Sequence, residues 1–224
     1  MTLSLIIFDC DGVLVDTELI ACSTVSTELE KLGIVISAEE IATRYIGVST
    51  SSMYGDLESS FGVVITADQR QVINSAVDAL LAACATAMPG VKQAIESLLE
   101  RYRVCVASSG SPPRIEGSLR RASLWDVFVG NVFSASQVKV GKPAPDLFLF
   151  AAAQMGVAAI EAIVIEDSVA GARAAQAAGM RCLGFTGGGH SNALLARALL
   201  ENGASAIFDD MADLLGLLES LPTL

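Results

Sequence analysis

The feature that most constrains this chain is an apolar run near its start that ends in acidic residues. Residues 5–8 read Leu-Ile-Ile-Phe, and Asp9-Cys10-Asp11-Gly12 follows directly. A continuous apolar run of this kind predicts a strand covered on both faces of a sheet. Asp9 and Asp11 lie two residues apart and project to the same side of an extended chain. They repel each other unless a cation such as Mg²⁺ lies between them, although a structural strand followed by an Asp-Gly turn is the plain alternative.

The rest of the chain divides into a helical stretch and a stretch of mixed character. Residues 17–87 carry amphipathic helical patterns without a convincing strand. From residue 88 onward, short apolar strands alternate with helices, which predicts βαβ units and a parallel sheet. We therefore predict an α/β fold with a Rossmann-like parallel sheet core, formed by residues 1–15 and 88–224, and an all-helical insert over residues 16–87.

Composition limits the partners of this protein. Of its 224 residues 52% are hydrophobic, so a sizeable core can be buried. The net charge of −11 and the pI of about 4.4 argue against nucleic acid and anionic membranes as partners. An anionic substrate stays possible, because a metal and one or two cations reverse the charge locally. The absence of a secretory pattern and of a bilayer-length apolar stretch predicts a soluble, cytoplasmic protein, with a monomer favoured.

The cysteines do not indicate a disulfide framework or a zinc site. There are five of them, they are widely scattered, and no C-x-x-C pair occurs. We expect them to be small apolar side chains in a reducing compartment.

Four polar clusters follow predicted strands or enter helices where a parallel sheet would bind a ligand, beyond the carboxyl ends of its strands. Each cluster alone has an ordinary explanation as a turn, a helix N-cap or a loop lysine. Their collection on one rim of the sheet has no such explanation. The four clusters are Asp9 with Asp11, Ser108-Ser109-Gly110, Lys142 within Gly141-Lys142-Pro143, and Glu166-Asp167-Ser168.

With these residues in view, the chain resembles the haloacid dehalogenase (HAD) superfamily of phosphatases. The match is to the branch that includes β-phosphoglucomutase and phosphoglycolate phosphatase, in which a small helical cap is inserted after the first motif. The order and spacing of the motifs span nearly the whole chain. The family's four motifs match the segment from Asp9 to Val13, then Ser108, Lys142, and the segment from Glu166 to Ser168.

The resemblance implies a phosphoric monoester hydrolase acting on a small phosphorylated metabolite, a sugar or sugar-acid phosphate. Asp9 is ionised at neutral pH and needs no base to attack phosphorus, which would form an aspartyl-phosphate. Asp11 would protonate the leaving oxygen and then activate water, a role that requires a raised pKa. Lys142 and Ser108 would bind phosphate oxygens, together with backbone N–H groups near Ser108. The segment Ser109-Gly110 supplies those groups.

The same resemblance implies Mg²⁺ as the cofactor. The side chains of Asp9 and Asp167 and the backbone carbonyl of Asp11 would hold the ion. Glu166 is open among three roles: direct ligand, ligand through water, or a group that orients the others.

Two features of the predicted cap bear on the substrate. Arg44 and Tyr45 open a segment that resembles the substrate-contacting cap loop of sugar-phosphate enzymes in this branch, although Arg44 also fits a solvated helix residue. β-Phosphoglucomutases carry an arginine and a histidine where this chain has Thr50 and Ala21. Both differences favour hydrolysis over a phosphomutase reaction.

Other functions remain as rivals. A phospho-accepting signalling domain also combines acids, a hydroxyl and a lysine on an α/β sheet, but here Cys10 separates the acids and a large insert interrupts the core. A catalytically inactive binding protein is a third possibility. His190 follows three glycines, and we expect a flexible loop at the pocket edge rather than a dinucleotide site or the catalytic base.

Overall fold

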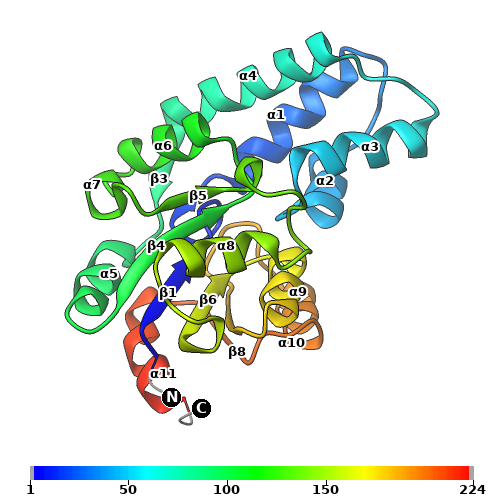
Figure 1. The fold of residues 1–224 in the computed structure, drawn as a ribbon. Helices are drawn as coiled ribbons and strands as arrows, with labels where there is room; N and C mark the ends of the chain where they lie inside the picture. The colour runs from blue at the N-terminus through cyan, green and yellow to red at the C-terminus, as the bar shows by residue number, and fades with distance from the viewer. Residues whose placement is uncertain (1–2, 222–224) are drawn as a thin grey trace.

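The computed structural model describes residues 3–221, and its centre is a six-stranded parallel sheet (Figure 1). The strand order is β5-β4-β1-β6-β7-β8, so β1 lies between β4 and β6. The α/β fold class and the parallel sheet are therefore confirmed. The strands are β1 (Leu5–Phe8), β4 (Arg103–Ser108), β5 (Val132–Ser134), β6 (Ala162–Glu166), β7 (Arg181–Phe185) and β8 (Ala206–Phe208).

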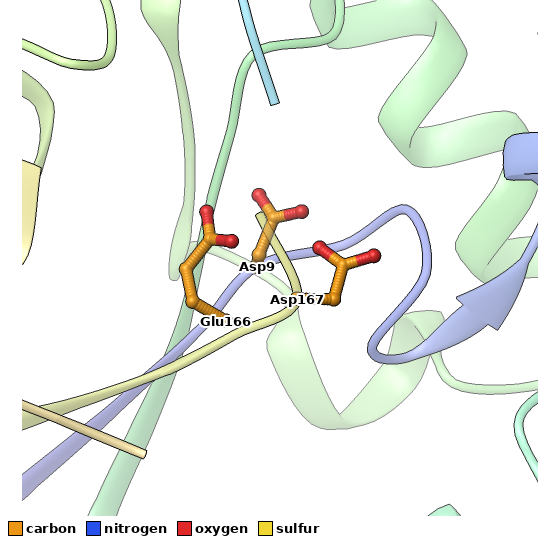
Figure 2. A group of neighbouring side chains, drawn as sticks. All are labelled: Asp9, Glu166 and Asp167. Atoms are coloured by element: carbon orange, nitrogen blue, oxygen red, sulfur yellow. The ribbon is translucent and has the colours of Figure 1, made fainter. Parts of the chain in front are cut away.

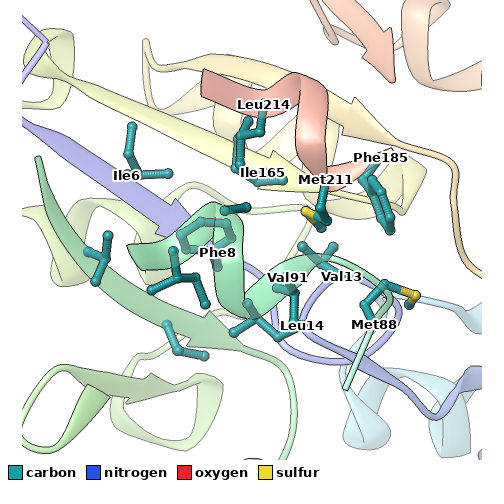
Figure 3. Close-up of a cluster of buried hydrophobic side chains, with 14 of the residues drawn as sticks. Ile6, Phe8, Val13, Leu14, Met88, Val91, Ile165, Phe185, Met211 and Leu214 are labelled. Atoms are coloured by element: carbon teal, nitrogen blue, oxygen red, sulfur yellow. The ribbon is translucent and has the colours of Figure 1, made fainter. Parts of the chain in front are cut away.

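Helices cover both faces of the sheet, which is why the inner residues of its strands are apolar. Ile6 and Phe8 of β1 face one core, shown in Figure 3, whereas Leu5 and Ile7 face the other. The first core is covered by α5 (Val91–Leu99), α6 (Pro112–Arg121), α7 (Trp125–Phe128) and α11 (Leu214–Ser220). The second is covered by α8 (Asp146–Gln154), α9 (Val169–Ala177) and α10 (Ala193–Glu201).

The segment between β1 and β4 contains four helices that share an apolar cluster of their own. The longest of these helices starts at a capping box between Thr66 and Gln69 and buries Ile73, Val77 and Leu81 at intervals of four residues. This spacing places the three side chains on one face of the helix. The helices are α1 (Glu18–Glu30), α2 (Ala38–Tyr45), α3 (Thr50–Phe61) and α4 (Ala67–Cys84).

A two-stranded antiparallel ribbon closes the base of this helical segment. It pairs β2 (Val15–Asp16) with β3 (Thr86–Ala87). Each strand has only two residues, and a strand that short cannot show an alternating pattern of apolar and polar residues. The sequence analysis therefore did not predict these two strands. The ribbon lies where the chain leaves and re-enters the sheet region, close to our predicted cap boundaries of 16 and 87.

Three one-turn 3₁₀ helices complete the described elements, at Ala135–Gln137, Ala159–Glu161 and Met211–Asp213. Within residues 3–221, no helix combines the length and the apolar character that crossing a bilayer requires.

The central strand supplies a test of the core. Ile7 is fully buried on β1, whereas Val35 is 77% exposed in a loop between α1 and α2. We expect Ile7→Ala to lower the free energy of unfolding by about 2–5 kcal/mol, because it leaves a cavity in a packed core. Val35→Ala should change it by less than about 0.5 kcal/mol. Urea denaturation followed by circular dichroism measures both, and equal effects would contradict this packing.

Candidate active site

The order of the strands brings the predicted site residues together. Phe8 of β1 pairs with Val106 of β4 and with Ile165 of β6, so the three strands run in register. The backbone N–H of Asp9 donates to the carbonyl of Ile165 at 2.9 Å. The residues that end these strands therefore meet at one edge of the sheet, at the position where connections leave β1 in opposite directions.

Three acidic side chains meet at this edge (Figure 2). Carboxylate oxygens of Asp9, Glu166 and Asp167 all lie within 4.8 Å of one another, and all three residues are buried. Lys142 is buried beside them and donates to Asp9 Oδ1 at 2.6 Å and to Glu166 Oε1 at 2.7 Å. A single ammonium group thus partly compensates three buried carboxylates.

Burial and mutual repulsion shift the pKa values of these groups. Burial raises the pKa of Asp9 to about 7, an effect that Lys142 opposes and Glu166 and Asp11 reinforce. This corrects the expectation from the sequence that Asp9 is ionised at neutral pH without further help, because burial disfavours its charged form. Burial also raises the pKa of Asp167 well above its usual range, with Glu166 and Asp9 adding to the effect. Burial opposes the charge of Lys142, but Asp9 and Glu166 outweigh it and raise the lysine pKa. The site therefore has more negative charge than its own cation stabilises.

The site fits a divalent cation. Both carboxylate oxygens of Asp167 are buried and have no hydrogen-bond partner among the described residues. His190 Nε2 lies 3.0 Å from Asp167 Oδ2, but the contact lacks hydrogen-bond geometry. A buried carboxylate without a partner is costly, and a hard cation with oxygen ligands would satisfy it.

Glu166 is held from both sides. Its Oε1 accepts from Lys142, and its Oε2 accepts from the Ser168 backbone N–H at 2.7 Å and from Ser168 Oγ at 2.8 Å. A Cβ at Gly171 would lie 1.7 Å from Glu166 Oε1, so only glycine leaves room for this carboxylate. Of the three predicted roles, these contacts favour the one in which Glu166 orients Lys142.

Asp11 is held differently from Asp9. Thr17 Oγ1 donates to Asp11 Oδ1 at 2.5 Å, and Arg114 Nη2 lies 3.6 Å from the same oxygen. The turn after Asp11 requires Gly12, which has a φ of +81° and where a Cβ would lie 1.7 Å from Asp167 Oδ2. Asp11 is not one of the three clustered acids, and it lines the pocket.

Ser108 ends β4 and is buried beside this cluster. Its Oγ accepts from the backbone N–H of Gly110 at 3.1 Å. Ser109 Oγ donates to the carbonyl of Gly47 at 3.1 Å, which ties the β4 loop to the loop between α2 and α3. Ser108, Ser109 and Gly110 all line the same pocket.

The pocket lies between the sheet edge and the inserted helices and has a volume of about 210 Å³. Tyr45 lines it, although its hydroxyl donates to Asp56 at 2.6 Å. Arg44 does not line it. The Arg44 guanidinium instead binds Glu40, Asp56 and Ser60, so the structure does not bring this predicted residue to the site.

Three charged pocket residues escaped the sequence analysis. Glu18 lies shortly after the first motif, Arg114 lies in the first turn of α6, and Asp78 lies in the middle of α4. The position of Glu18 beside the first motif was the only sequence signal. Asp78 and Arg114 looked like ordinary helix residues.

Comparisons with known proteins agree with this geometry. The haloacid dehalogenase-like hydrolase family matches residues 3–179. The 6-phosphogluconate phosphatase of Escherichia coli is 28% identical over 191 residues, covering 85% of this chain and 86% of the relative. The phosphorylated carbohydrates phosphatase of Thermotoga maritima is 30% identical over 206 residues, covering 90% and 92%. A haloacid dehalogenase-like protein of unknown function from Agrobacterium tumefaciens has a similar structure, with a TM-score of 0.82 and 36% identity over 97% of this chain and 98% of that one.

The chain belongs to the haloacid dehalogenase-like hydrolase family. The prediction of the family and that of an enzyme of the phosphatase type are both confirmed at this level.

The contact between Gly47 and Ser168 gives a test of how the insert closes on the site. Gly47 has a φ of +76°, and a Cβ there would lie 2.0 Å from Ser168 Oγ. We expect Gly47→Ala to lower kcat/KM for phosphate release from p-nitrophenyl phosphate by about tenfold or more, because the loop must move away from the site. Gly55→Ala is the matched control, since a Cβ at Gly55 meets nothing within 4 Å. Equal activity of both variants would contradict close packing of this loop on Ser168.

The raised pKa of Asp9 predicts how its charge affects stability without metal. The folded protein keeps a proton on Asp9 up to about pH 7, whereas the unfolded chain loses it near 3.8. Folding stability from this group is therefore present at low pH and is lost as the pH rises from about 4 to above 7. In EDTA, the free energy of unfolding of Asp9→Asn minus that of the unmodified protein should therefore rise as the pH increases from about 4 to above 7. Urea denaturation at several pH values measures it, and a difference that stays constant or falls would contradict the prediction.

Proposed function

We propose that this protein is a Mg²⁺-dependent phosphomonoester hydrolase that acts on a small phosphorylated sugar or sugar acid through an aspartyl-phosphate on Asp9. The observation that carries the proposal is the arrangement of Asp9, Lys142, Glu166 and Asp167 at one sheet edge, with Asp11 and Ser108 facing the adjoining pocket. Each role that phosphoryl transfer needs has a residue in place.

Asp9 is the proposed nucleophile because it lies at the centre of the site and lines the pocket. Lys142 binds its Oδ1, which fixes the carboxylate and counters the negative charge of an incoming phosphate. Attack on phosphorus forms the aspartyl-phosphate and releases the alcohol, so one difficult step becomes two. Ser108 and the backbone around Gly110 bind the phosphoryl oxygens.

Asp11 is the proposed acid and base. It donates a proton to the leaving oxygen and then takes one from the water that hydrolyses the aspartyl-phosphate. The hydrogen bond from Thr17 to Oδ1 holds its carboxyl group in one orientation. Asp11 lines the pocket and is not one of the three clustered acids, which suits a residue that reacts with the substrate instead of binding metal through its side chain.

The side chains of Asp9 and Asp167 and the backbone carbonyl of Asp11 are the proposed metal ligands. When bound, Mg²⁺ would neutralise charge between the nucleophile and the phosphate and align the two. Glu166 is proposed to act through Lys142, since both of its oxygens are already engaged.

Hydrolysis is favoured over a phosphomutase reaction by two pocket residues. Ala21 and Thr50 both line the pocket, at the positions where the resemblance places a histidine and an arginine in β-phosphoglucomutases. Neither side chain can bind a second phosphate by charge. We further propose that residues 16–87 act as a cap over the core formed by residues 1–15 and 88–224, and that the enzyme works in the cytoplasm.

The pocket volume of about 210 Å³ is below the range of roughly 300–1,000 Å³ that is typical of sites for drug-sized ligands. A pocket of this size favours a small phosphorylated metabolite as the substrate. Two of the relatives are named for phosphorylated sugar or sugar-acid substrates, which supports the same class here.

The nucleophile and the metal can be tested together. Phosphate release from sugar phosphates in Mg²⁺ should fall by at least about 1,000-fold in Asp9→Asn, since this variant lacks the attacking oxygen. EDTA should abolish the activity of the unmodified enzyme, and added Mg²⁺ should restore it. Asp126→Asn, at an exposed position, is the control and should keep full activity.

Full activity of Asp9→Asn at matched metal would disprove the assignment of the nucleophile. An isomerised sugar phosphate in place of free phosphate would indicate a mutase. A phosphoprotein that persists for minutes without turnover would indicate a signalling domain.

A further inference from the structure

The glycine-rich loop between β7 and α10 has no role in the mechanism above. It reads Gly187-Gly188-Gly189-His190. The loop turns its histidine inward, because the side chain is only 2% exposed and its Nε2 lies 3.0 Å from Oδ2 of Asp167. His190 therefore lies directly against one of the proposed metal ligands, although it belongs to none of the four motifs that place the other residues of the site.

Glycines on two segments make this close approach possible. A Cβ at Gly188 would lie 2.8 Å from Cε1 of the His190 ring and 3.0 Å from its Nδ1. A Cβ at Gly12, in the turn after the first motif, would lie 3.0 Å from the same Cε1. The imidazole ring is thus packed between its own loop and the turn that follows Asp11, which leaves it little freedom to move away from Asp167.

Packing alone does not account for a histidine at this position. Both ring nitrogens of His190 are buried, and neither has a hydrogen-bond partner among the described residues. A buried polar group without a partner destabilises a fold relative to an apolar side chain of similar size. The Nε2 of His190 and the Oδ2 of Asp167 are already at a hydrogen-bond distance, so a small change in the orientation of either side chain would complete a bond.

Metal binding supplies the condition under which this bond matters. A carboxylate must be ionised to bind a cation, and the buried position of Asp167 disfavours that charge. A hydrogen on Nε2 of His190 would donate to Oδ2 and stabilise the ionised carboxylate. Neutral imidazole carries one N–H and imidazolium carries two, so either form can supply this hydrogen.

We propose that His190 is a positioning residue that holds Asp167 in the orientation that binds the metal. It donates from Nε2 to Oδ2 and leaves the other carboxylate oxygen to the cation. Such partners of metal ligands fix the orientation of the ligand and raise the affinity of the site. This inference rests on the proposed function, since it concerns the metal site of that function, and it gives the glycine-rich loop a role in that site.

The affinity of the protein for Mg²⁺ tests this role without an activity assay. His190→Leu removes the donor, so the Kd for Mg²⁺, measured by isothermal titration calorimetry on the metal-free protein, should rise by at least about tenfold. His190→Gln keeps an N–H donor at a similar reach and should stay within about threefold of the unmodified protein. Leu194→Ala, at a 79% exposed position in the first turn of α10, is the control and should leave the Kd unchanged.

An unchanged Kd in His190→Leu would overturn the inference. Equal losses of Mg²⁺ affinity in His190→Leu and His190→Gln would also overturn it, because the N–H donor would then not be the reason for the loss. In urea without metal, His190→Leu should unfold at an equal or higher midpoint than the unmodified protein, since it removes buried nitrogens that lack partners. Equal falls of the midpoint in both variants, together with equal losses of affinity, would assign the ring to packing alone.

Gly188 gives an independent test that changes the position of the ring instead of its chemistry. Gly188 does not have a positive φ, so alanine can adopt its backbone conformation, and the added Cβ would press on the His190 ring. We expect Gly188→Ala to raise the Kd for Mg²⁺ by about threefold or more when His190 is present. It should have no further effect in His190→Ala, which lacks the ring. The same increase in both backgrounds would overturn the inference, because the loop would then act on the metal site without His190.

Failure of the proposed function would give a different result. An unmodified protein that binds no Mg²⁺ and releases no phosphate from sugar phosphates would overturn the proposed function. A Mg²⁺-dependent phosphatase whose Kd for Mg²⁺ does not respond to substitution of His190 would overturn only the role of His190.

Discussion

The charge balance at the carboxyl end of β1 is the constraint on which the rest of the site depends. Asp9, Glu166 and Asp167 lie buried within 4.8 Å of one another, and Lys142 binds two of them. Such a cluster would oppose folding unless surrounding contacts stabilised it. Part of that stabilisation is visible in the hydrogen bonds from Ser168 to Glu166. The buried oxygens of Asp167 have no partner among the described residues, which is compatible with the cation proposed above.

Glycines make the close approaches around this cluster possible. Gly12 lies against Asp167, Gly171 against Glu166, and Gly47 against Ser168, each at a distance that excludes a Cβ. The last contact joins the inserted helices to the sheet core. Ser168 binds Glu166 on one side and contacts Gly47 of the inserted segment on the other. The position of the inserted helices is therefore linked to the position of the clustered acids.

The sequence predicted the residues proposed to react with phosphate more fully than the residues that line the rest of the pocket. Asp9 and Asp167 follow apolar strands and Ser108 ends one, so a parallel sheet was enough to predict that they lie at the same edge. Arg44 showed the opposite outcome, because a helix residue can point either to the pocket or to solvent, and its partners Glu40 and Asp56 hold it away. Arg114 and Asp78 were missed for the same reason. Their helices, α6 and α4, are in contact in the structure, but nothing in the sequence indicates that contact.

By itself, the sequence determined the strands of the six-stranded sheet, the helical insert and the order of the acids, hydroxyl and lysine along the chain, because these follow from local apolar patterns and residue chemistry. Only the tertiary structure decided that Lys142 bridges Asp9 and Glu166, that Thr17 holds Asp11, and that Arg114 faces acids from two other helices. The physical reason is that hydrogen bonds and charge interactions act over a few ångströms, and such separations between residues far apart in the chain are set by packing.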